Sequence, residues 1–83
     1  MTIQTKYEIG QHIWFIYEHG GEVHVYDDYI SSIGWEEYLF YITKDSYEEL
    51  KEGDIILYEE TDKLVTKIKE LMKEIREKEA EWY

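Results

Sequence analysis

The chain has 83 residues, a net charge of −11, no cysteine and 17% aromatic residues. A chain of this length forms one small domain, which buries only about 60–65% of the surface that its unfolded form exposes. The lack of cysteine excludes disulfides and thiolate-bound metals. No apolar stretch approaches the ~20 residues of a membrane span, and residues 1–10 lack the features of a signal peptide, so we expect a soluble cytoplasmic protein without membrane contact.

The negative charge is confined to the first part of the chain. Residues 1–60 hold 14 acidic residues against Lys6, Lys44 and Lys51, whereas six acids and six bases balance in residues 61–83. DNA, RNA and anionic membranes are bound through Lys and Arg, so direct nucleic-acid binding is not expected. The excess charge either keeps the protein in solution or serves association with a positive surface.

The first expected element is a strand that begins near Gln11. Ile13, Phe15 and Tyr17 fall on one of its faces, because strand residues alternate with a period of two. Gly20 and Gly21 supply the positive φ of a hairpin turn, and the return strand starts at Val23. The alternation fails near Asp27, where we expect a bulge or bend.

Further short strands follow. Alternating apolar residues predict a strand at 37–44, a turn at 45–46, a short segment at 47–50, a turn at 53–54 and a strand at 55–58. Four or five antiparallel strands without a helical period between them predict a small, partly closed barrel or a strongly bent sheet in residues 1–60.

Residues 61–83 change to a helical period. The apolar residues have the spacing of one helix face, at Leu64, Val65, Ile68, Leu71, Met72 and Ile75. Thr61 suits the N-cap. The predicted class is therefore α+β, with the sheet and this helix in a single domain. The helix either docks on its own sheet or pairs with a second chain through Leu71, Ile75 and Trp82, although its two apolar heptads fall short of a coiled coil.

Two segments resemble parts of SH3 domains. Residues 48–57 (EELKEGDIIL) are similar to the diverging turn, and residues 25–29 (VYDDY) to the aromatic-acidic peptide-binding motif. The paired tryptophans and the closing proline of that family are missing, so no peptide-binding site is transferred.

A broader resemblance covers most of the chain. The order of KYEIGQHIWFIY, a glycine hairpin, a strand ending in ISSI and then IILYEETDKLVTKI is similar to short phage and prophage proteins of Gram-positive bacteria. This resemblance implies an SH3-like barrel followed by a helix. It also implies a setting, in the host cytoplasm, in which small acidic proteins inhibit host systems, including nucleic-acid-directed defence.

An aromatic residue followed by two carboxylates occurs four times, beginning at Tyr26, Trp35, Tyr47 and Tyr58. Neighbours in a strand point to opposite faces, so an adjacent pair cannot supply the two carboxylates of an acid/base site. Phosphate-loop and nucleophile motifs are absent, and we predict no catalytic residue and no cofactor. His12 and His24 could face each other across the first hairpin as metal ligands, but the acids lack calcium-loop spacing and no metal is predicted.

The sequence instead favours an acidic recognition surface that binds a basic host protein, without catalysis, as an inhibitor or nucleic-acid mimic. The predicted partner-binding residues are Asp27, Asp28, Tyr29, Trp35, Glu36, Glu37, Glu48 and Glu49. One alternative is a protein that sequesters a nucleotide-like ligand, with Lys63, Lys67 and Arg76 as its cations. Others are an accessory subunit assembled through the helix, or acids that serve solubility alone.

Overall fold

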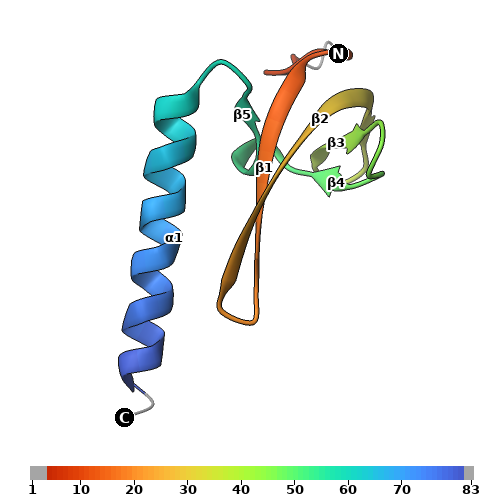
Figure 1. Ribbon diagram of the computed structural model, residues 1–83. Helices are drawn as coiled ribbons and strands as arrows, with labels where there is room; N and C mark the ends of the chain where they lie inside the picture. The colour runs from red at the N-terminus through yellow and green to blue at the C-terminus, as the bar shows by residue number, and fades with distance from the viewer. Residues whose placement is uncertain (1–3, 82–83) are drawn as a thin grey trace.

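The computed structural model describes residues 4–81 as an antiparallel sheet followed by one helix (Figure 1). The elements are β1 (His12–His19), β2 (Glu22–Trp35), β3 (Leu39–Thr43), β4 (Glu49–Leu50), the 3-10 helix η1 (Glu52–Asp54), β5 (Ile56–Leu57) and α1 (Thr61–Glu81). The five strands have the order β4-β3-β2-β1-β5, and the sheet is not closed. The predicted α+β class, the bent SH3-like sheet and the single C-terminal helix are confirmed, and of the two predicted forms the open sheet is the one observed.

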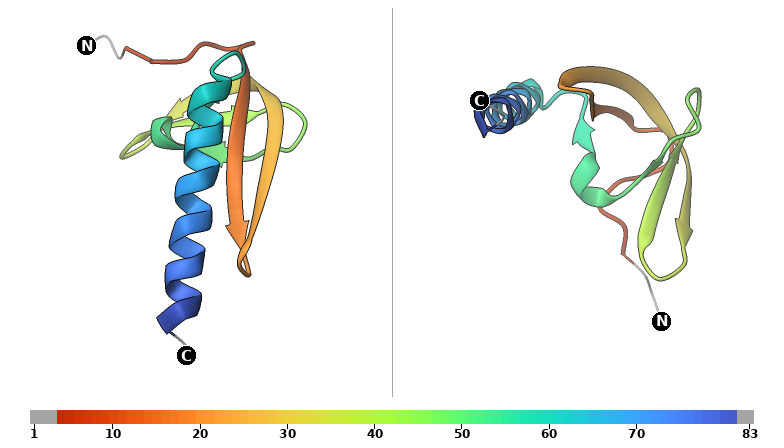
Figure 2. Two further views of the ribbon diagram at one scale, coloured as in Figure 1. Left: turned by 60° about the vertical axis from the view of Figure 1, so that its left-hand side comes forward. Right: turned by 90° about the horizontal axis from the view of Figure 1, so that it is seen from below.

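The long strand β2 gives the sheet its shape. Its first part pairs with β1, from His19↔Glu22 to His12↔Tyr29, and its second part pairs with β3, from Ile30↔Thr43 onward. The register shifts between Ile30 and Ser32, and the sheet curves there (Figure 2). The irregularity predicted near Asp27 therefore lies further along, because the segment before Ile30 keeps an unbroken register with β1.

The core lies on the concave face of the curved sheet. Its buried members are Tyr7, Ile13, Phe15, Ile30, Tyr41, Leu50 and Ile55. Tyr7 precedes the first strand, yet its hydroxyl donates a hydrogen bond to the Ile55 carbonyl at 3.1 Å. Its ring meets Tyr41 edge-on with 5.6 Å between centroids. The segment before β1 thus covers part of the core that the open sheet leaves uncovered.

Helix α1 packs on the opposite face, against β1, β2 and β5 (Figure 2). Leu64 is buried, and Ile68, Leu71 and Ile75 are half-buried. The helix runs beside the β1–β2 hairpin as far as its turn, since a Cβ at Gly21 would lie 3.9 Å from Ile75. Docking of the helix on its own sheet is therefore present. Within residues 4–81, no helix is long and apolar enough to cross a membrane.

Candidate functional site

Asp28 does not belong to an exposed acidic surface. Only 3% of it is exposed, and its carboxylate accepts hydrogen bonds from the hydroxyl and amide of Ser46 and from the amides of Tyr29 and Asp45. Burial raises the pKa of Asp28, but these hydrogen bonds outweigh it and hold the pKa below its ordinary value. The carboxylate therefore has a structural role, and we leave it out of the candidate binding surface.

Asp27 and Tyr29 lie on the other face of β2, beside a stack of rings. The ring of His12 stacks on Tyr29 at 4.4 Å and on Tyr58 at 3.7 Å, and Tyr58 in turn stacks on Trp14 at 4.7 Å between centroids. The Asp27 carboxylate contacts His12 Nε2 at 2.7 Å. We call these four rings the ring stack. It contains Tyr58, the first residue of one triplet, and contacts Asp27 of the triplet that begins at Tyr26.

Glu49, the last residue of the triplet at Tyr47, contacts the turn between β2 and β3, which holds the triplet at Trp35. The Tyr38 hydroxyl donates a hydrogen bond to Glu49 at 3.2 Å, which raises the Tyr38 pKa. Trp35 is 57% exposed, and Glu36 and Glu37 are exposed beside it. We call these five residues the Trp35 face. A shallow groove of about 460 Å³ runs along it, lined by Gln4, Trp35, Tyr38, Leu39, Lys51, Glu52 and Gly53.

Glu48 lies apart from the Trp35 face. Its carboxylate accepts a hydrogen bond from the Tyr17 hydroxyl on the β1–β2 hairpin. That bond is the main reason why the pKa of Tyr17 is raised to about 12, with burial and the charges of Glu48 and Asp54 adding to it. The half-buried Glu48 thus links the hairpin to the segment that precedes β4.

The predicted residues therefore fall into separate groups rather than on one rim. Trp35, Glu36, Glu37 and Glu49 share the Trp35 face, Asp27 and Tyr29 border the ring stack, and Asp28 and Glu48 bind within the fold. Leu71 and Ile75 are half-buried on the helix, and Trp82 lies outside the described residues. The prediction missed His12, Trp14, Tyr38, Lys51 and Tyr58. For His12 and Trp14 the sequence does contain a signal, because strand alternation places both residues on the same face of β1.

The two histidines weighed as metal ligands lie on opposite faces of the hairpin. His12 pairs with Tyr29 and His24 with Tyr17, and residues 12 and 17 of β1 differ in face. Among residues 4–81, no group of three or more His, Cys, Asp or Glu side chains is placed to hold a metal ion.

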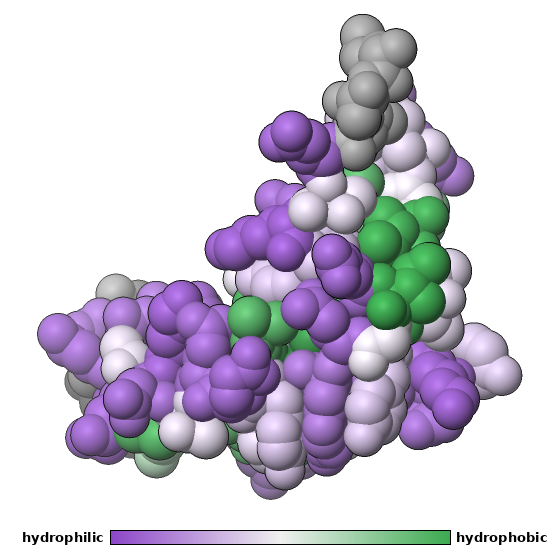
Figure 3. All heavy atoms as spheres, turned by 90° about the horizontal axis from the view of Figure 1, so that it is seen from above, coloured by the Kyte–Doolittle hydropathy of each residue, from purple (hydrophilic) through white to green (hydrophobic). Residues whose placement is uncertain are grey.

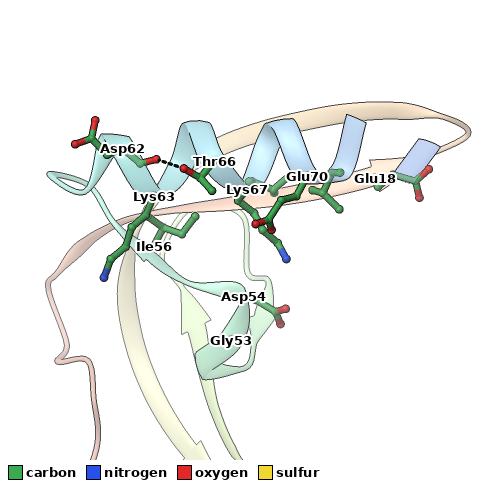
Figure 4. A pocket seen from close by; sticks show the side chains of 11 residues that line it. Glu18, Gly53, Asp54, Ile56, Asp62, Lys63, Thr66, Lys67 and Glu70 are labelled. Carbon is green, nitrogen blue, oxygen red and sulfur yellow. Dashed lines mark hydrogen bonds between the residues drawn. The ribbon is translucent and has the colours of Figure 1, made fainter. Parts of the chain in front are cut away.

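A larger groove, of about 620 Å³, separates α1 from β1 and β5. Its floor includes Ile16, Ile56 and Leu71, and Figure 4 shows Lys67 extending from the helix toward Asp54. Four carboxylates border it together with Lys63 and Lys67, namely Glu18, Asp54, Asp62 and Glu70. Lys63 already pairs with Glu60. This charge balance does not favour a phosphate-bearing ligand.

The surface seen from above is mainly hydrophilic, with one larger apolar area and smaller apolar areas apart from it (Figure 3). Few of its carboxylates are neutralised. Within the described part of the chain, Lys63–Glu60 is an ion pair, and His12–Asp27 and His24–Glu22 are ion pairs only when the imidazole is protonated, so no acid of the Trp35 face pairs with a lysine.

Comparisons with protein families, with curated proteins and with solved structures found no match. The resemblance to short phage proteins therefore stays a prediction.

Proposed function

We propose that this is a non-catalytic binding protein whose Trp35 face binds a basic segment of another protein. The observation that carries the proposal is the position of Lys51. Its Nζ lies 4.9 Å from the centroid of the Tyr38 ring, while the hydroxyl of that ring is bonded to Glu49. An ammonium group on an aromatic face beside a carboxylate is the arrangement that a lysine or arginine of a partner would make.

The composition of the Trp35 face supports this proposal. Tryptophan and tyrosine are enriched among residues that contribute most to binding energy, and here both stand exposed beside a groove. Glu36, Glu37 and Glu49 lie outside the ion pairs of the described residues. Their charge is free to attract a basic partner over a distance and to speed its association.

Inhibition is the form of this activity that the excess of acidic residues favours. A basic groove that normally holds nucleic acid would be occupied by carboxylates in place of phosphates and by rings in place of bases. The partner is then a nucleic-acid-binding host protein, as the layout resemblance also implies. A competition experiment tests the mimicry directly. DNA or RNA should displace this protein from its partner, because both would occupy the same basic groove.

The experiment is site-specific photo-crosslinking in host lysate, with a photoreactive amino acid at Trp35 and, as a matched control, at Tyr47. Both side chains are exposed, Tyr47 at 81%, but Tyr47 lies outside the Trp35 face. We expect one basic protein to be crosslinked from the first position and not from the second. Equal crosslinking from both positions would reject the Trp35 face as the binding surface. The same conclusion would follow if a partner is recovered bound to the protein but is not crosslinked from position 35.

A further inference from the structure

The first part of β2 has a free edge. β3 pairs with β2 from Ile30 to Trp35, so within residues 4–81 the segment from Glu22 to Tyr29 has a paired strand, β1, on one side only. The two-residue turn Gly20–Gly21 closes on the pair His19↔Glu22. Hydrogen-bonded and non-bonded pairs alternate in an antiparallel ribbon, so Val23, Val25 and Asp27 direct their backbone N–H and C=O groups outward.

The middle of this edge has little protection against pairing. Proteins blunt free edges with charged residues, proline or a bulge. The segment 22–27 has no proline or lysine, its two charged residues, Glu22 and Asp27, stand at its ends, and the register shift of β2 comes later, after Ile30. The segment is six residues long, which is a full strand's length, and it alternates valine with polar and aromatic side chains. Such an edge is a template for strand addition.

An apolar groove of about 300 Å³ lies directly beside the free edge. Its walls are Val23 and Val25 of the strand and Ile68, Met72 and Ile75 of α1, with Gly21 and Arg76 at its end. Val25 is 37% and Met72 44% exposed. A strand added at the edge of β2 would continue the sheet beneath this groove, and apolar side chains on that strand would cover it.

We propose that the occupant is a second copy of this chain, joined by antiparallel pairing of the two β2 edges around a two-fold axis at His24. In this register Val23 of each copy pairs with Val25 of the other, and their side chains point to the helix side. The two sheets become one continuous sheet, and the grooves of both copies merge into a single apolar layer closed by the two Met72 side chains.

Charge at the groove favours a second copy over an unrelated strand. Asp27 lies two residues beyond Val25 on the helix side of β2, and its side chain is half-exposed. In the His24-centred register, Asp27 of one copy lies opposite Gly21 of the other, where Arg76 borders the groove and the Glu79 carboxylate lies 3.8 Å from the position of a Cβ on Gly21. Arg76 would be the cation shared by Glu79 of its own chain and Asp27 of the other copy, and this contact is made twice across the two-fold axis. The helices that flank this contact carry little net charge, so the strongly acidic Trp35 faces remain at the outer ends.

The experiment is sedimentation velocity of the full chain over a range of concentrations, combined with amide hydrogen exchange. Val25→Pro removes an outward N–H without removing a β1–β2 bond, and Met72→Lys places a charge in the groove. Glu18→Pro is the control, because it removes an outward N–H on the β1 edge of the hairpin. It also removes the hydrogen bond from the Gly21 amide to the Glu18 carboxylate, so its circular dichroism is compared with that of the wild type first. We expect a dimer for the wild type and for Glu18→Pro, and at least a tenfold higher dissociation constant for the other two variants.

Dimer formation should also slow the hydrogen exchange of the Val23 and Val25 amides, and this protection should increase with protein concentration. A wild type that is monomeric up to about 1 mM, where only very weak association would remain, overturns the proposal. A dimer that persists in Met72→Lys with folded circular dichroism also overturns it. If Val25→Pro fails to fold, the result for Met72→Lys tests the proposal by itself. This proposal stands independently of the Trp35 face, whose variants leave the β2 edge unchanged.

Discussion

The carboxylate of Asp28 accepts hydrogen bonds from the hydroxyl and the backbone amide of Ser46, at 2.7 and 2.9 Å. These bonds tie the middle of β2 to the turn between β3 and β4, at the point where the sheet changes its pairing from β1 to β3. The Ser46 hydroxyl also lies 2.8 Å from that of Thr43, which is fully buried. A polar group at this site stabilises the fold because every donor around it is satisfied.

Replacing Asp28 by asparagine should lower the free energy of unfolding by about 2 kcal/mol. The hydrogen bonds to a charged acceptor are lost, and an NH2 group, which is a donor, takes the place of one acceptor oxygen. Urea denaturation measures this. Asp27→Asn is the matched control. It alters an exposed contact with His12 and should change stability by no more than about 0.5 kcal/mol. Equal losses in the two variants would contradict the structural role of Asp28.

The lowered pKa of Asp28 predicts a specific loss of stability in acid. In the unfolded chain the group titrates near its ordinary pKa of about 3.9, and in the folded chain it titrates below that value. Its contribution is therefore present above pH ~4 and is lost as the pH falls through the folded pKa. The free energies of unfolding of the wild type and of Asp28→Asn, measured with urea between pH 7 and about 2.5, should converge at the acid end. A constant difference between the two free energies over this pH range would reject the assignment.

Local patterns predict part of this arrangement. Strand alternation separates Asp27 from Asp28, so the sequence alone shows that their side chains point to opposite faces. Which of the two is buried depends on the turn at Asp45–Ser46, whose position against β2 follows from the long-range pairing of β3. A buried carboxylate surrounded by donors has no signature in its own neighbourhood, because the donors come from a distant turn.

The same distinction explains the candidate site. The strands and the helix follow from periods of two and 3.6, which adjacent residues display. The contact of Tyr38 with Glu49 and that of His12 with Tyr58 join segments that are far apart in the sequence, and they depend on sheet order and register. Tyr7 is a further example, since it joins the core from a segment without any repeating pattern. Sequence alone therefore predicts the triplets but not which of their residues come together.

The Tyr17 hydroxyl should ionise well above the ordinary pKa of a tyrosine. Its hydrogen bond to Glu48 raises its pKa to about 12, so the bonded form stabilises the fold below about pH 10 and that contribution is lost as the pH rises through about 12. Absorbance titration should show a step near pH 12 that disappears in Tyr17→Phe and moves to lower pH in Glu48→Gln. Glu49→Gln is the control, because Glu49 accepts from Tyr38 instead. An unchanged step in Tyr17→Phe would refute the assignment.

Gly34 leaves room for the ring of Phe40 on the neighbouring strand. A Cβ at Gly34 would lie 2.2 Å from Phe40 Cζ, which requires the ring or the strands to move. We expect Gly34→Ala to lower the free energy of unfolding by about 1–3 kcal/mol, the usual cost of overpacking. Gly53→Ala is the control, since a Cβ there meets nothing within 4 Å. Thermal denaturation distinguishes them, and equal melting temperatures would show that Phe40 moves away at no cost.

Charge and ring contacts on the Trp35 face should affect binding in different ways. Trp35→Ala removes an exposed ring and should weaken binding by about 2 kcal/mol at any salt concentration, mainly through faster dissociation. Glu36→Gln with Glu37→Gln removes charge and should slow association and flatten its dependence on salt. Surface plasmon resonance with the crosslinked partner, at several salt concentrations, separates the two effects. Neutralising Glu59 and Asp62 removes the same charge near the start of α1. If that control slows association as much as the Glu36 and Glu37 variant, the total charge of the protein acts on the partner, and the Trp35 face contributes through its rings alone.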